Sequence, residues 1–193
     1  MAEESPVVGL ERAARTVGGW CWAERRCFEI LGGWVRDADE PALKAMFARH
    51  SRHHAWRADR WAEILPRAYV PSADSLVVGG LDGGIFDLMG THGPSANGVA
   101  AHYDVLYPAL LAAYQDSIVV MHPVTDGPAL RAIRIILGDA FYDFGEVEVL
   151  RSELALGVVD VSLLAHLRVA LKKNQVRVVE QGNSASVFRR WGS

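Results

Sequence analysis

Apolar residues recur every three or four positions through most of the chain, the spacing that places them on one face of an α-helix. The first such stripe predicts a helix over residues 10–37, and its apolar positions include Val17, Cys21, Phe28, Leu31 and Val35. A polar turn follows. Pro41, a residue type favoured at the start of a helix, then opens a second predicted helix that ends near Leu65. These two segments predict an antiparallel helical hairpin.

The second half of the chain repeats this organisation. We expect helices over residues 97–122 and 128–156, followed by a last amphipathic helix over 160–180. The segment 67–98, which joins the two hairpins, is rich in Gly, Ser and Asp, with room for a short helix or two turns over 75–89. A connection of this length between helices is typical of a crossover.

The sequence therefore predicts an all-α fold. We expect a single domain over residues 1–193, in which a four-helix bundle covers residues 10–156. In this layout a long crossover joins two antiparallel hairpins, and one more helix follows at the C-terminus. Half of the residues are hydrophobic and 22% are charged, a balance that suits a packed domain.

Polar residues interrupt the apolar stripes of the first two predicted helices, at positions expected to lie at the same height along the hairpin. Glu24 stands inside the stripe of the first helix, and His50, His54 and Arg57 stand in the middle of the stripe of the second. In an antiparallel pair of helices, residues equally far from the turn lie at the same height. The turn centres near residue 39, fifteen positions after Glu24 and fifteen before His54. We therefore expect these two side chains to lie opposite each other.

Polar residues of the second hairpin are also expected to lie at one height along the bundle. Its turn lies near residue 125, which places Asp143 and Glu146 at the height of about Asp104 to Tyr107. A bundle that brings acids and histidines from several helices to one level has the composition of a metal site. Arg57 is expected to pair with a carboxylate there, either Asp143 or Glu24.

The first hairpin also carries a resemblance to a known family. Its two helices, WCWAERRCFEILGGWV and RHSRHHAWRADRWAEILP, resemble those of the ferritin-like superfamily, in particular bacterial ferritin-like domain proteins of unassigned function. The family pattern is one Glu on each of two helices and Glu-x-x-His on each of the other two. Glu24 matches the first Glu. The remaining positions depart from the pattern, with His50-x-x-His53 or His54-x-x-Arg57, Asp104, and Asp143-x-x-Glu146 in their places.

The resemblance implies a function and the residues that perform it. It implies a non-haem metal oxygenase or oxidase that acts on a small organic substrate with dioxygen. The cofactor would be iron, as one or two ions, or else manganese. The implied metal ligands are Glu24, His50, His54, Asp143 and Glu146. The implied catalytic residues are His54, Arg57 and Tyr107.

A second reading uses the same residues without a metal. In it, the bundle has lost its metal and serves as a binding or interaction module, or as an enzyme that uses His54 as a general base. Arg57 separates the two readings, because a permanent cation in the site repels a metal ion unless a carboxylate stands between them. In the metal-free reading Arg57 itself supplies the local positive charge.

Composition limits the classes of partner and the cellular location that we expect. The net charge of −3 is unlike that of a general nucleic-acid binder, so we expect no nucleic-acid partner. No apolar run reaches the ~18 residues of a membrane span, and the start of the chain lacks the apolar core of a signal peptide, so we expect a cytoplasmic protein. The six tryptophans are compatible with a homodimer. His92, His102, His122 and His166 are expected in turns or at the surface.

Overall fold

The computed structural model describes residues 6–66, 73–79, 84–154 and 158–180, and every regular element among them is helical. The all-α prediction is therefore confirmed for this part of the chain. The elements are α1 (Pro6–Asp37), α2 (Pro41–Ile64), the 3₁₀-helix η1 (Ala73–Leu76), α3 (Gly84–His92), α4 (Ala96–Ala100), the π-helix η2 (Ala101–Leu106), α5 (Tyr107–Val120), α6 (Gly127–Glu153) and α7 (Val161–Glu180).

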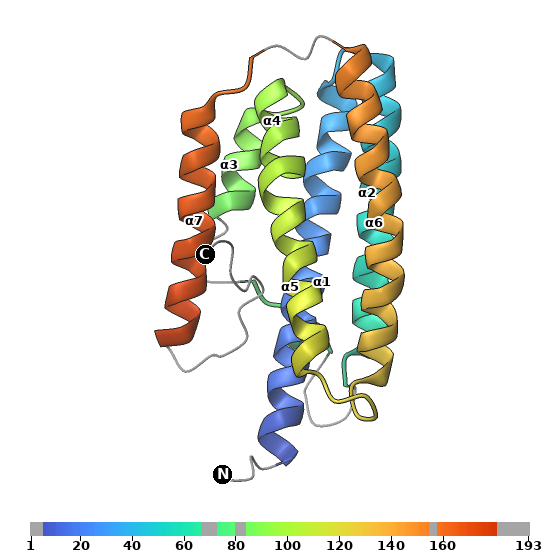
Figure 1. Ribbon diagram of the computed structural model, residues 1–193, viewed down its shortest axis with the longest axis vertical. Coiled ribbons are helices and arrows are strands. Elements are labelled where there is room, and N and C mark those ends of the chain that lie inside the picture. The colour runs from blue at the N-terminus through green and yellow to red at the C-terminus, as the bar shows by residue number, and fades with distance from the viewer. Residues whose placement is uncertain (1–5, 67–72, 80–83, 155–157, 181–193) are drawn as a thin grey trace.

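The long helices lie side by side along one axis (Figure 1). α1 packs on α2, while α6 packs on α2 and on α5. α7 lies at the left edge of the view in Figure 1, with α6 at the right edge, and it contacts α3 and η2. The predicted helix positions agree with the observed ones to within a few residues. Parts of the predicted crossover, residues 67–72 and 80–83, lie outside the described residues, as do 155–157.

Close backbone contact fixes η1 against α1 and so holds part of the crossover on the helical core. A Cβ atom added at Gly18 would lie 2.0 Å from the carbonyl oxygen of Leu76. Only glycine permits this approach. A second close backbone contact follows α3. Gly93 has φ of 60°, and a Cβ atom added at Gly98 would lie 1.8 Å from the carbonyl oxygen of Gly93. This turn places the start of α4.

The segment α4–η2–α5 is one continuous run of helix with a change of winding in its middle. η2 is a π-helix of six residues, which is long for a form that usually occurs as a single turn, often at functional sites. Pro108 stands in the first turn of α5. Because proline has no backbone N–H, it cannot donate to the carbonyl four residues earlier, that of Asp104. The ordinary α-helical ladder is therefore interrupted where the π-helix lies.

Aromatic side chains fill much of the apolar core between the helices. Trp20, Trp61 and Tyr114 form one aromatic cluster with ring centroids 4.9–5.3 Å apart, and Trp34 packs on Phe47 further along. Among the described residues, no helix combines the length and the apolar character that crossing a membrane requires.

Candidate functional site

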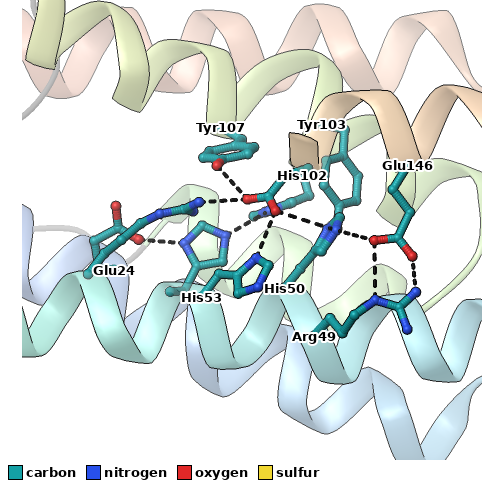
Figure 2. A network of polar contacts seen from close by, with 11 residues as sticks. Glu24, Arg49, His50, His53, His102, Tyr103, Tyr107 and Glu146 are labelled. Carbon is teal, nitrogen blue, oxygen red and sulfur yellow. Dashed lines mark hydrogen bonds and ion pairs between the residues drawn. The ribbon is translucent and has the colours of Figure 1, made fainter. Parts of the chain in front are cut away.

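Among the residues whose burial the structure describes, seven polar side chains lie inside the helical core: Glu24, His50, Ser51, His54, Arg57, His102 and Asp143. All except Ser51 belong to two adjoining groups of polar contacts, contributed by α1, α2, η2 and α6 (Figure 2). We call these two groups, together with their partners Tyr103, Tyr107, Tyr114, His53, Glu146 and Arg49, the polar centre.

Glu24 and His54 meet directly, as the turn arithmetic predicts. Nδ1 of His54 bonds Oε2 of Glu24. Tyr114 donates to the other carboxylate oxygen over 2.6 Å and in turn accepts a 3.2 Å bond from the indole of Trp61. Both oxygens of the carboxylate are therefore engaged by side chains of α2 and α5.

His102 extends this chain and corrects the expectation that it lies at the surface. Its side chain is completely buried, and its Nε2 lies 3.3 Å from Nε2 of His54. Because His54 uses Nδ1–H toward Glu24, a neutral His54 accepts at Nε2 and His102 donates. Burial, together with the nearby His54 and His50, lowers the pKa of His102 well below its usual value. His102 is therefore neutral at physiological pH.

Arg57 and Asp143 form the second half of the centre. Nη2 of Arg57 donates to Oδ2 of Asp143 over 2.6 Å, and the hydroxyl of Tyr107 donates to the same oxygen over 2.8 Å. His53 reaches Oδ1 over 2.7 Å from the half-exposed face of α2. The Arg57 guanidinium also lies over the ring of Tyr107, 5.3 Å from its centroid.

Charge pairing outweighs burial in this half. Burial by itself would raise the pKa of Asp143, but Arg57 and His50 bring it down to about 2. Burial would likewise lower the pKa of Arg57, but Tyr107, Glu24 and Asp143 raise it instead. Arg57 and Asp143 are therefore a charged pair at neutral pH.

The centre reaches the surface at one end through His50. Its Nδ1 lies 2.6 Å from the hydroxyl of Tyr103, and its Nε2 lies 3.1 Å from Glu146. Arg49 binds both oxygens of Glu146 at the protein edge. Burial lowers the pKa of His50 to about 4 although Asp143 opposes this. A continuous line of polar contacts thus leads from Tyr103 to solvent (Figure 2).

Three buried polar atoms of the centre have no hydrogen-bond partner among the described residues. They are Nε and Nη1 of Arg57 and Nδ1 of His102. An unpartnered buried donor or acceptor typically costs about 1–3 kcal/mol of folding free energy.

The expected metal ligands are neighbours, but their donor atoms do not converge. A zinc- or iron-type ion needs its ligand atoms about 2.0–2.2 Å away and directed at one point. Here Glu24 faces Nδ1 of His54, both oxygens of Asp143 accept hydrogen bonds, and Glu146 is bound by Arg49. The described residues contain no group of three or more His, Cys, Asp or Glu side chains that could hold a metal ion. This arrangement does not fit a shared metal ion, and metal binding stays a prediction.

The other expected site residues occupy distinct positions. Arg57 and Tyr107, expected to be catalytic, both lie against Asp143 at the centre. Asp104, the substitute for a ligand on the third helix, instead faces outward and pairs with Arg151 over 2.8 Å. Its place at the centre is taken by His102.

Sequence reasoning missed His102 and Tyr114, although a signal for both exists. Residues 98–114 have the sequence GVAAHYDVLYPALLAAY. Apart from its tyrosines, this run contains two ionisable residues, which are His102 and Asp104. A helix that is apolar nearly all round is buried on most of its surface. A helix with this composition therefore buries more than one face, and His102 and Tyr114 are expected to lie on its buried faces.

Comparison with protein-family models, with curated proteins and with solved structures gives no match. The resemblance to the ferritin-like superfamily accordingly stays a prediction, carried by the first hairpin alone.

Proposed function

We propose that this chain is a metal-independent helical bundle of the ferritin-like kind, which acts as a binding or interaction module. In it an internal cation, Arg57, replaces the metal ion at the centre. The observation that carries the proposal is the position of Arg57. It is completely buried and donates to Asp143, in the middle of the residues that the family resemblance assigns to a metal.

Electrostatics supports this assignment. Arginine keeps its charge in proteins under all ordinary conditions. A divalent ion about 5 Å from a guanidinium is repelled by roughly 7 kcal/mol at an effective dielectric constant of about 20. Asp143, the carboxylate that would have to stand between the two cations, already accepts hydrogen bonds at both of its oxygens.

The same network supports a role in fixing the helices. Glu24 links α1 to α2 and α5, and Asp143 links α6 to α2 and α5. Buried ion pairs often add little net stability, but removing one partner of such a pair strongly destabilises the folded protein. In this proposal the centre selects one register of the helices, and the outer faces of the helices carry the contacts with partners.

Thermal unfolding with and without metal tests the proposal. A metal at 100 times its dissociation constant adds about 2.7 kcal/mol to the folded state, which raises the melting temperature of a chain of this size by roughly 5–11 °C. We expect no such shift with iron(II), manganese(II) or zinc(II), and none on adding a chelator. A shift that disappears in His54→Ala/His102→Ala, but persists in the exposed control His166→Ala, would overturn the proposal.

One observation favours a second candidate, the metal-dependent oxidation that the resemblance implies. The Nε2 atoms of His54 and His102 face each other over 3.3 Å. Two nitrogens bound to one tetrahedral ion at about 2.0–2.1 Å lie roughly 3.3–3.4 Å apart. The bond from His54 Nδ1 to Glu24 is also the contact by which a carboxylate orients a metal-binding histidine. A metal held there would supply oxidation of a small organic substrate with dioxygen, and the unfolding experiment above distinguishes the two candidates.

A further inference from the structure

The outward face of α6 carries a stripe of apolar and small residues with nothing packed on it among the described residues. Ile135, Tyr142 and Val149 follow one another at intervals of seven, with exposed fractions of 43%, 77% and 54%. Gly138 and Gly145 stand between them. A Cβ atom added at either glycine would meet no heavy atom within 4 Å. α6 packs on α2 and α5 through its other side.

This stripe is self-complementary about Tyr142. Ile135 and Val149 lie seven positions before and after it, and Arg131 and Glu153 lie eleven positions before and after it. At 100° per residue, both spacings return to within about 20° of the same direction on the helix. A rotation by 180° about an axis through Tyr142 therefore places the apolar residues opposite each other and a base opposite an acid.

We propose that a second copy of this chain docks on this stripe, with the two α6 helices antiparallel and Tyr142 at the two-fold axis. Arg131 then pairs with Glu153 of the partner subunit, and Ile135 packs on Val149 of the partner subunit. Because the interface is isologous, each contact occurs twice.

Three features of the surface support a second copy as the occupant. Arg131 and Glu153 are exposed, and neither has an acidic or basic partner among the described residues. The two glycines allow the helix backbones to approach closely. On the stripe itself the base Arg131 stands before Tyr142 and the acid Glu153 after it, so an antiparallel pair aligns opposite charges at these positions and a parallel pair aligns like ones. The inference rests on this surface alone and is independent of how the polar centre works.

Sedimentation equilibrium of charge variants tests the pairing. We expect the wild type to dimerise, and Arg131→Glu and Glu153→Arg each to weaken dimerisation at least tenfold. The double variant Arg131→Glu/Glu153→Arg should restore it, since it rebuilds both ion pairs with reversed sign. Within one chain these residues are 22 positions apart, ~33 Å along the helix, so recovery requires two copies. Circular dichroism confirms that each variant is folded.

Cross-linking tests the position of the axis. A residue on a two-fold axis meets its own copy, so Tyr142→Cys should cross-link with a short thiol–thiol reagent. Asp116→Cys, at an exposed position on α5, should not, and neither should the wild type, whose Cys21 and Cys27 are buried. A wild type that stays monomeric up to about 100 µM, single reversals without effect, or a double variant that remains as weak as the singles would each overturn the proposal.

Discussion

Replacing Arg57 by methionine tests how the buried charges hold the fold. Methionine keeps much of the volume of arginine but removes the full positive charge that Arg57 places against Asp143 inside the core. Asp143 keeps its bonds from Tyr107 and His53. Its carboxylate nevertheless becomes a buried charge without a buried counter-charge.

The size of the effect follows from the pKa of Asp143. In the wild type this pKa is about 2 rather than 3.8, a difference of roughly 2.5 kcal/mol at 1.36 kcal/mol per unit. Adding the penalty of an uncompensated buried charge gives a loss of about 3–5 kcal/mol at pH 7. For a chain of this size, that loss lowers the melting temperature by roughly 6–20 °C.

The pH dependence separates a lost charge pair from lost packing. A carboxyl with a depressed folded-state pKa contributes stability that is present above pH 4 and disappears as the pH falls through about 2. Without Arg57, burial dominates and Asp143 takes up a proton more easily. The difference between variant and wild type should therefore be largest at neutral pH and shrink toward pH 4.

Urea unfolding from pH 4 to 8 measures this difference directly. The double variant Arg57→Met/Asp143→Leu is the matched control, since it removes both charges and should recover most of the loss. A loss below about 1 kcal/mol at pH 7, or one that is equally large at pH 4, would refute the reasoning.

Two further predictions concern His50 and two glycines of α1. His50 has a pKa of about 4 in the fold and near 6.5 when unfolded, so the unfolded chain binds more protons between these values. Stability should rise with pH across this window by up to about 3 kcal/mol, and an NMR titration that finds His50 ionising near 6.5 would contradict this. Gly18→Ala should destabilise by about 1–3 kcal/mol, because its Cβ would collide with the backbone of Leu76. Gly33→Ala, where the space is open, should stabilise by about 0.5–1 kcal/mol; thermal unfolding with shifts of the same sign would show the contact at Gly18 to be wrong.

The helices and one pairing could be predicted because they follow from periodicity. Apolar spacing, Pro41 and the polar turns locate α1 and α2 to within a few residues. The contact between Glu24 and His54 follows from equal distance to a short turn. Such a turn fixes the heights of two helices relative to each other, and an error of a residue or two leaves the pairing intact.

The arrangement of the donor atoms could not be predicted in the same way. Periodicity gives the height and face of a side chain, but not which oxygen of Asp143 receives Arg57 and which receives His53. His102 lies in the π-helix η2 and is buried in the core, and a pattern based on 3.6 residues per turn does not contain this change of winding. Pro108 is the sequence signal that could have pointed to it.

Elemental mass spectrometry of the purified, untagged protein tests the central claim most directly. The protein is produced with iron and manganese supplied, beside the variant Glu24→Ala/His54→Ala. If Arg57 stands in place of a metal, both proteins contain far less than one metal ion per chain while the wild type is folded and stable. One or two ions per chain in the wild type, lost in the variant, would contradict the claim and favour the metal-dependent oxidase.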